Sequence, residues 1–227
     1  MKKIILVLSL LMGILLVGCG SKKDEKKVVY VGTNAEFAPF EFLEGDKVTG
    51  FDMELIAEIG KVAGFEVEVK NQAFDGLLPA LQSGKIDLII AGMTVTDERK
   101  KAVDFSEIYY TANHGILVKA EDVDKYTDFS DLDGLKVGAQ LGSTQAELAS
   151  TLIKDANLQL LSNVNNLILE LKSGKVDAVV MEVGVAQMAV KNNPELAVGK
   201  PVYEETDSGN AIAIAKGNED LVKIVNG

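Results

Sequence analysis

From Val28 onward, short apolar runs alternate with segments in which apolar residues recur every three or four positions. The short runs predict buried strands, and the three-to-four spacing predicts amphipathic helices. Their alternation is typical of βαβ units, so the pattern predicts an α/β fold with largely parallel sheet. The expected strands are 28–32, 65–69, 86–90, 135–139 and 176–180, and the expected helices are 52–63, 75–83 and one from Gln145.

The helix expected over 52–63 shows how a face and an end are predicted. Gly64 supplies the stop, because glycine readily takes the left-handed conformation that ends helices. Its apolar face should comprise Leu55, Ile56, Ile59, Val62 and Ala63.

One ten-residue pattern occurs twice along the chain. Residues 81–90 read LQSGKIDLII, and residues 171–180 read LKSGKVDAVV. Each copy combines a helix end, a glycine cap and a buried strand. The repetition predicts two similar α/β domains; the alternative is a common helix–glycine–strand connection used twice within one sheet.

The N-terminal segment has the layout of an export signal. Lys2 and Lys3 precede an apolar run, Ile4–Val17, which is too short for a comfortable membrane span. Small residues then precede Cys19, an arrangement that resembles the bacterial lipobox, in which the cysteine becomes lipid-modified. We expect residues 1–18 to be a signal peptide and polar residues 19–27 a lipid-anchored tether. A plain signal peptide with an incidental cysteine is the alternative.

Composition narrows the classes of function. Cys19 is the only cysteine, which excludes an intrachain disulfide, a cysteine metal site and a Cys-His nucleophile. The net charge of -11 argues against nucleic acid as a partner. His114 is the only histidine, and hydrolase, phosphate-loop and zinc motifs do not occur. We therefore expect no metal, no cofactor and no enzymatic activity; acid/base chemistry by Glu182 is the remaining enzymatic alternative.

Candidate binding groups follow the two repeated strands. Ligands of open α/β sheets lie beyond the carboxyl ends of strands. The first copy is followed by Gly92, Thr94 and Arg99, and the second copy is followed by Glu182. If these segments face each other across a cleft, a fixed positive charge and a carboxylate suit a zwitterion.

Arg99 is the strongest of these candidates, because its planar fork matches the geometry of a carboxylate. It falls in the first turn of a helix that Thr96 is expected to cap, where backbone N–H groups favour an anion. A second helix start at 142–147 gives Thr144 and Glu147 the spacing of a capping box. The alternatives are a surface ion pair for Arg99 and a purely structural cap.

The ligand's side chain needs walls and polar partners of its own. Phe37 and Phe74 are the expected apolar walls, whereas Phe40 is expected in the core. The polar candidates, each of which is also compatible with an ordinary loop or cap, are Asn34, Glu36, Asp52 and Gln140.

Three segments, 32–42, 50–55 and above all 87–110, carry a family resemblance. The chain resembles the polar amino-acid substrate-binding proteins of ABC importers, the group of histidine, lysine/arginine/ornithine and glutamine binders. The resemblance runs from about Val28 to the end. It implies an α/β, two-lobed periplasmic-binding-protein fold of type II with two hinge-strand crossings. Lobe 1 would comprise 28–114 plus 211–227, and lobe 2 would comprise 115–210.

The resemblance also implies a role for each candidate. Arg99, Thr94, Gly92 and Thr144 would bind the ligand's α-carboxylate, and Glu182 would take the place of the family's usual aspartate at the α-ammonium. The groups implied around the ligand's side chain are Phe37, Phe74, Asn34, Glu36, Asp52 and Gln140.

The implied function is that of an extracytoplasmic lipoprotein, a monomer, which closes on a polar L-amino acid and delivers it to the permease of an ABC importer. Glu36, Asp52 and Gln140 favour a basic ligand. Asn34 stands where basic-amino-acid binders carry an acid, so glutamine or histidine specificity stays an alternative, as does a sensor. The family continues with more C-terminal helix, so we expect lobe 1 to be incompletely covered after Gly227.

Overall fold

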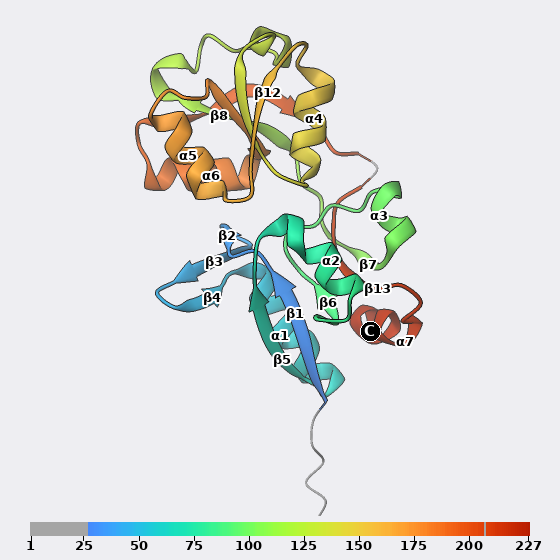
Figure 1. Cartoon of the computed structure of the whole chain (residues 1–227). Coiled ribbons are helices and arrows are strands. Elements are labelled where there is room, and N and C mark those ends of the chain that lie inside the picture. Colours follow the sequence, from blue (N-terminus) through green and yellow to red (C-terminus); the bar gives the residue numbers. More distant parts are fainter. Residues whose placement is uncertain (1–26, 207) are drawn as a thin grey trace, which may run out of the picture.

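The computed structural model describes residues 27–206 and 208–227, which form two α/β lobes stacked end to end (Figure 1). Each lobe is built on one five-stranded sheet. The predicted signal peptide, Cys19 and nearly all of the predicted tether lie outside the described residues.

The first sheet has the strand order β5-β1-β6-β13-β7. β1 pairs in parallel with β5 and β6, and β13 runs antiparallel to β6 and β7. A small antiparallel sheet, β2-β3-β4, projects sideways from the upper part of the first lobe, and β2 is its strand nearest the second lobe (Figure 1). The strands are β1 (Val28–Thr33), β2 (Glu36–Phe37), β3 (Glu41–Glu44), β4 (Lys47–Thr49), β5 (Glu66–Asn71), β6 (Leu88–Ile89), β7 (Val103–Tyr110) and β13 (Asn210–Ala215). The helices are α1 (Phe51–Ala63), α2 (Leu77–Gln82), α3 (Asp97–Ala102) and α7 (Glu219–Asn226), with a 3-10 turn at Phe74–Gly76.

The second sheet has the order β10-β9-β11-β8-β12, with β9, β10 and β11 parallel and β8 antiparallel to both of its neighbours. Its strands are β8 (His114–Lys119), β9 (Lys136–Gln140), β10 (Asn157–Leu161), β11 (Ala178–Glu182) and β12 (Leu196–Tyr203). Its helices are α4 (Thr144–Leu152), α5 (Val164–Lys172) and α6 (Val183–Asn192), and 3-10 turns lie at Ala120–Asp122 and Phe129–Leu132.

The chain passes between the sheets twice. It leaves the first sheet after Tyr110 and enters the second at His114, then leaves the second after Tyr203 and re-enters the first at Asn210. His114 therefore begins β8 of the second sheet, and Asn210 begins β13 of the first. The lobe boundaries drawn from the sequence at 114/115 and 210/211 stay a prediction.

The repeated pattern occupies matching places in the two lobes, once in each sheet. Gly84 and Gly174 end their helices with φ of 71° and 74°. The aspartate that follows accepts a backbone N–H from the neighbouring strand in both cases, Asp87 from Tyr30 at 2.7 Å and Asp177 from Lys136 at 3.0 Å. The repeat therefore serves two sheets, and the alternative of a single sheet is wrong.

Helix α1 buries a narrower face than its sequence predicts. Gly64 ends it in the left-handed conformation, as expected. Val62, however, is 89% exposed, and Gly60 is buried in its place. A Cβ at Gly60 would lie 3.1 Å from the Phe65 carbonyl oxygen, so the helix approaches its own connection most closely there. Ala63, the last residue of the predicted face, is exposed as well, so the face expected from the sequence is wrong at its C-terminal end.

Candidate functional site

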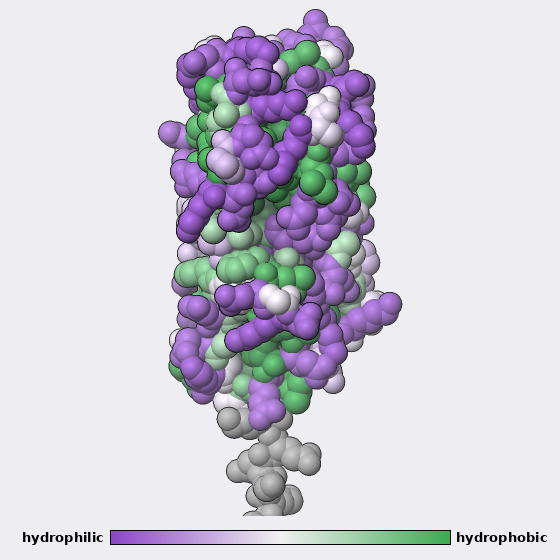
Figure 2. Space-filling view, turned by 90° about the vertical axis from the view of Figure 1, so that its left-hand side faces the viewer, coloured by the Kyte–Doolittle hydropathy of each residue, from purple (hydrophilic) through white to green (hydrophobic). Residues whose placement is uncertain are grey.

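A cavity with about 280 Å³ of empty space lies between the lobes. It sits beyond the carboxyl ends of β1, β6 and β9. On the face shown in Figure 2, hydrophilic side chains cover much of both lobes. The lining residues are Asn34, Phe37, Glu41, Phe74, Ala91, Gly92, Thr94, Arg99, Gln140, Ser143, Thr144 and Gln145.

Arg99 lines this cavity from α3 and is 8% exposed. Its Nη1 donates to the Thr94 carbonyl oxygen at 2.6 Å, and its Nη2 donates across the lobes to the Gly142 carbonyl oxygen at 3.0 Å. Its guanidinium lies 5.5 Å from the centre of the Phe74 ring. The two carbonyl oxygens thus hold both Nη atoms of the Arg99 guanidinium in a fixed orientation.

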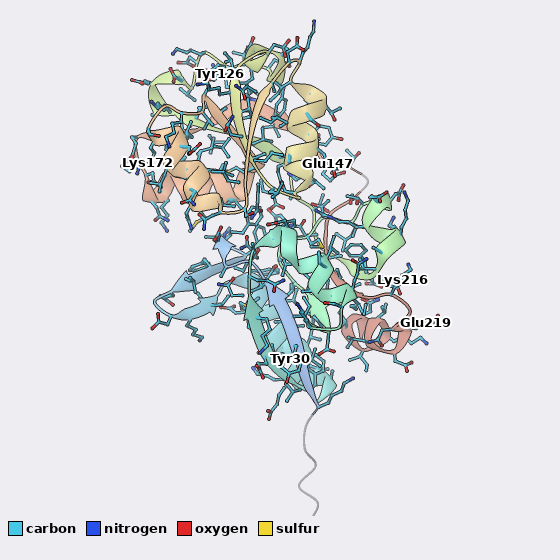
Figure 3. The ribbon with its side chains drawn as sticks, in the orientation of Figure 1. Tyr30, Tyr126, Glu147, Lys172, Lys216 and Glu219 are labelled. Carbon is cyan, nitrogen blue, oxygen red and sulfur yellow. The ribbon has the colours of Figure 1, made fainter. Side chains whose placement is uncertain are left out.

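Burial lowers the pKa of Arg99 to about 10, and the negative charge of Glu147 opposes that shift. Glu147 is labelled on α4 in Figure 3, at the end of the second lobe that faces α3. The side chain therefore keeps its positive charge at neutral pH. The alternative of a surface ion pair is wrong, because among the described residues the acids Asp97, Glu98 and Asp104 pair with Lys100, Lys101 and Lys216.

Two helices begin at the cavity. Thr96 caps α3 as expected, since its Oγ1 accepts the Arg99 backbone N–H at 3.1 Å. The cap of α4 is Ser143, whose Oγ accepts the Ala146 N–H at 3.2 Å, so the capping box expected from Thr144 and Glu147 is wrong. Ser143 takes the extended conformation that a cap requires. Thr144 becomes the first helical residue, and its hydroxyl oxygen lies 3.4 Å from that of Thr94.

Gly92 brings backbone close to the aromatic wall. Its φ is 53°, and a Cβ there would lie 3.1 Å from the Phe37 ring. Its N–H donates to Oδ2 of Asp52 at 3.0 Å. Phe37 and Phe74 both line the cavity, whereas Phe40 is buried in the core as expected.

Asn34 and Gln140 join the two lobes through their side chains. Gln140 Nε2 donates to Asn34 Oδ1 at 2.8 Å, and Asn34 Nδ2 donates to the Gln72 carbonyl oxygen at 3.0 Å. Both residues line the cavity. Their amides can therefore contact a ligand and hold the lobes together.

Three expected ligand groups do not line the cavity. Glu36 lies at the N-terminus of α5, where Val164 N–H donates to it at 2.8 Å and Asn163 also donates. Asp52 lies behind Gly92, and the Tyr109 hydroxyl donates to it at 2.9 Å. Glu182 accepts from Asn210 Nδ2 at 3.0 Å.

Burial raises the pKa of each of these acids. Hydrogen bonds from Val164 and Asn163 limit the rise at Glu36, and those from Gly92 and Tyr109 oppose it at Asp52. For Glu182, burial raises the pKa to about 8 against the opposing Asn210 hydrogen bond.

The sequence reasoning missed Glu41, Ala91, Ser143 and Gln145. Glu41 is the most consequential, because it is 1% exposed and places a carboxyl group in the cavity wall. Burial above all, and then the charges of Asp52 and Glu182, hold its pKa well above the usual range. An acid between two phenylalanines in the run 37–42 was the available signal, since charged residues rarely occupy buried strand positions without a role.

The lining of the cavity thus offers one guanidinium, several amides and hydroxyls, and one buried acid, Glu41. A small molecule that carries both a carboxylate and cationic groups matches this set of charges. Among residues 27–206 and 208–227, His, Cys, Asp and Glu form no group of three suited to a metal ion.

Comparison with known proteins agrees with this geometry. Residues 29–227 match the model of the family described as bacterial extracellular solute-binding proteins, family 3. The arginine-binding extracellular protein ArtP of Bacillus subtilis is 40% identical over 88% of this chain and 78% of its own. A probable histidine-binding protein of Campylobacter jejuni is 38% identical over 94% of this chain and 86% of its own.

A solved structure gives the same fold. It is the amino acid ABC transporter substrate-binding protein AbpA of Streptococcus pneumoniae bound to L-arginine. It superimposes with a TM-score of 0.84 at 41% identity, covering 88% of this chain and 86% of that one. The resemblance drawn from the sequence and the two-lobed α/β fold are therefore confirmed.

Proposed function

This chain belongs to family 3 of the bacterial extracellular solute-binding proteins, and we propose that it binds a basic amino acid, arginine in the first place, for an ABC importer. The observation that carries the proposal is the cavity between the lobes, where Arg99 and the buried acid Glu41 line the same small space. Relatives named for arginine and histidine, and a similar structure with L-arginine bound, support it.

The carboxylate of the ligand is bound by Arg99, Thr94, Gly92 and Thr144. Arg99 presents a fork held by two carbonyl oxygens, and the two threonine hydroxyls meet across the lobes. Glu182 serves the α-ammonium, and its Oε2, which is buried and has no hydrogen-bond partner among residues 27–206 and 208–227, supports that role. A positive group that approaches this oxygen gains a charge-assisted hydrogen bond.

The side chain of the ligand is contacted by Phe37, Phe74, Asn34, Gln140 and Glu41. The rings supply apolar walls, the two amides supply donors and acceptors, and Glu41 supplies the negative charge that favours a basic group. Asp52 acts from behind Gly92, and Glu36 acts through its contact with α5.

A panel of the twenty amino acids, ornithine and citrulline in a thermal-shift assay tests this function, because a ligand that binds only the folded protein raises its melting temperature. Arginine should give the largest increase, followed by other basic amino acids. Stabilisation by glutamine or histidine without any by arginine would replace the ligand but leave amino-acid binding in place. A panel without any stabilising member would overturn the proposal.

We also propose closure about the two chain passages as the binding movement, by a monomer with lobes 28–114 plus 211–227 and 115–210. The hydrogen bonds that cross between lobes, from Arg99 to Gly142 and from Gln140 to Asn34, support it. Small-angle scattering should show a monomer whose radius of gyration falls when arginine is added. An unchanged radius would argue against closure.

Membership of an extracellular family agrees with the predicted export signal, and we propose anchoring through a lipid on Cys19. Among the described residues, no helix is long and apolar enough to cross a membrane. Cys19→Ala should leave the protein without lipid, either released or unprocessed, as judged by detergent partitioning and mass spectrometry. Wild-type protein that washes off membranes without detergent would contradict the anchor.

The family consists of binding proteins, which confirms the prediction of a non-enzymatic role. A transport protein delivers its ligand to a permease, whereas a sensor does not, so an uptake experiment distinguishes the two functions. Uptake of labelled arginine should fall when the gene is deleted.

A further inference from the structure

Glu41 and Asp52 form a pair of buried carboxyl groups at the cavity wall. Glu41 is 1% exposed and Asp52 is 0% exposed. Oε2 of Glu41 and Oδ1 of Asp52 have no hydrogen-bond partner among the described residues. The Asp52 backbone N–H donates to the carbonyl oxygen of Phe40 at 2.9 Å, which places Asp52 beside Glu41, and the negative charge of Asp52 raises the pKa of Glu41. Two ionised carboxylates in this position repel, and neither can donate. One shared proton satisfies both oxygens.

The proton has a defined place within the pair. Oδ2 of Asp52 accepts from the Gly92 N–H at 3.0 Å and from the Tyr109 hydroxyl at 2.9 Å, and both bonds favour an ionised Asp52. The negative charge of Asp52 in turn raises the pKa of Glu41, which favours the protonated form of Glu41. Glu41 therefore carries the proton and donates it to Asp52. Glu41 is also the member of the pair that lines the cavity.

We propose that the Glu41–Asp52 pair selects the ligand by charge: a cationic side chain takes the place of the shared proton, whereas a neutral side chain leaves that proton bound. This deepens the proposed function and rests on it. The exchange breaks only the O–H bond of Glu41, whose carboxylate then pairs with the ligand's cation. The proton passes to solvent, so one proton leaves for each cationic side chain bound.

The charged and titratable groups around the pair favour this exchange. Tyr109 on β7 is neutral, because burial and the neighbouring acids hold its pKa well above the usual range. The charge of Glu182 on β11, when that group is ionised, raises the pKa of Glu41 further. Arg99 on α3 lines the same cavity and is oriented by Thr94 and Gly142. With Arg99 engaged there, the acid pair lacks a permanent counter-ion, and a cationic side chain supplies one.

Isothermal titration calorimetry at pH 7 tests the exchange. Arginine and citrulline are each titrated in phosphate and in Tris, whose different ionisation enthalpies convert the measured heats into a count of protons released. Citrulline has nearly the shape of arginine but a neutral side chain, and both bring the same carboxylate and ammonium. Arginine should release about one more proton than citrulline, because each ligand cation replaces one shared proton.

Two variants separate the pair from other acids. Glu41→Gln should abolish the difference in proton count and reduce the preference for arginine over citrulline. Asp75→Asn removes an exposed acid beside Gly142 without touching the pair, and it should keep the difference. Equal counts for arginine and citrulline in the wild type would overturn the proposal and leave arginine binding intact. Failure of arginine to bind at all would overturn the proposed function itself.

Weak binding of citrulline does not prevent the test. In that case the proton count for arginine is measured on Glu182→Gln, in which the Glu41–Asp52 pair is the remaining carboxyl source beside the ligand. A count near one supports the exchange, and a count near zero refutes it.

Discussion

The carboxylate of Glu36 accepts the backbone N–H of Val164 at 2.8 Å, so an acid of the first lobe occupies the N-terminus of helix α5 in the second. Asn163, which caps α5, donates to the same carboxylate. In Figure 1, β2 with Glu36 lies directly beneath the helices of the second lobe. This contact joins the two lobes, so it should form as the lobes meet in the proposed closure.

Removal of the Glu36 carboxylate should weaken binding of every amino acid to a similar extent. Glu36→Ala loses two hydrogen bonds at a half-buried position, each worth about 0.5–1.5 kcal/mol, so Kd should rise by roughly two- to tenfold per bond lost. Calorimetry with arginine and lysine measures the effect. Glu44→Ala, an exposed acid of the same small sheet, is the control and should bind as the wild type does. An effect confined to one ligand would place Glu36 at the ligand instead.

Replacement of Arg99 should also affect all ligands, but far more strongly. Arg99→Ala removes the charge proposed for the carboxylate, a loss of about 2–5 kcal/mol in comparable buried charge pairs. Arg99→Lys should bind poorly as well, since one ammonium cannot reach Thr94 O, Gly142 O and a ligand in the geometry of the fork. Lys100→Ala, an exposed neighbour on α3, is the control. Near wild-type affinity in a folded Arg99→Ala would place the carboxylate elsewhere.

The sequence predicted the fold better than the contacts of individual side chains. The repeat at 81–90 and 171–180 predicted two domains because helix end, glycine and strand are local features that each lobe forms separately. Glu36 looked like a ligand group because it follows a strand end, but its partner Val164 is 128 positions away. Such a partner depends on how the lobes meet, which local patterns do not encode.

The helix caps illustrate the same limit at short range. Ser143 and Thr144 are both good caps by residue type, and the spacing of Thr144 to Glu147 favoured the wrong one. Ser143 caps α4 because its backbone follows the turn at Gly142, whose φ is 78°. Glu41 was missed because acids in apolar runs are usually exposed on the open face of a strand. Here both faces of that position are covered, and the acid is buried.

Gly92→Ala should lower both stability and affinity. At φ of 53° an alanine costs about 1 kcal/mol of backbone strain. Its Cβ would also lie 3.1 Å from the Phe37 ring, which narrows the ligand site. Gly84→Ala is a matched control, because φ is 71° there and nothing lies within 4 Å. Urea unfolding should show a loss in both variants, whereas arginine binding should weaken only in Gly92→Ala. Equal binding in both would exclude Gly92 from the site.

Glu182→Gln should make the ligand-free protein more stable at pH 8 while it weakens binding of every amino acid. Burial raises the pKa of Glu182 to about 8 in the folded protein, above its ordinary value of 4.5. A group whose pKa is higher in the folded state adds stability below its unfolded pKa and loses it as the pH rises through the folded pKa. The wild type therefore loses this contribution between pH 4.5 and pH 8, by at most about 1.4 kcal/mol per pH unit.

Glutamine keeps the neutral form at every pH, so the variant should match the wild type near pH 5 and exceed it at pH 8 by roughly 1–3 kcal/mol. His114 shifts the other way, because burial lowers its pKa to about 4 and its contribution is lost on acidification. Glu41 and Asp52 shift in the same direction as Glu182. The contribution of His114 is common to both proteins and cancels in the difference. The pKa of Glu41 is raised partly by the charge of Glu182, so loss of that charge adds to the stability of the variant at pH 8. Urea unfolding of both proteins at pH 5 and pH 8 without ligand measures this difference in the free energy of unfolding. A variant that is less stable than the wild type at pH 8 would mean that the Asn210 hydrogen bond outweighs the burial of the charge.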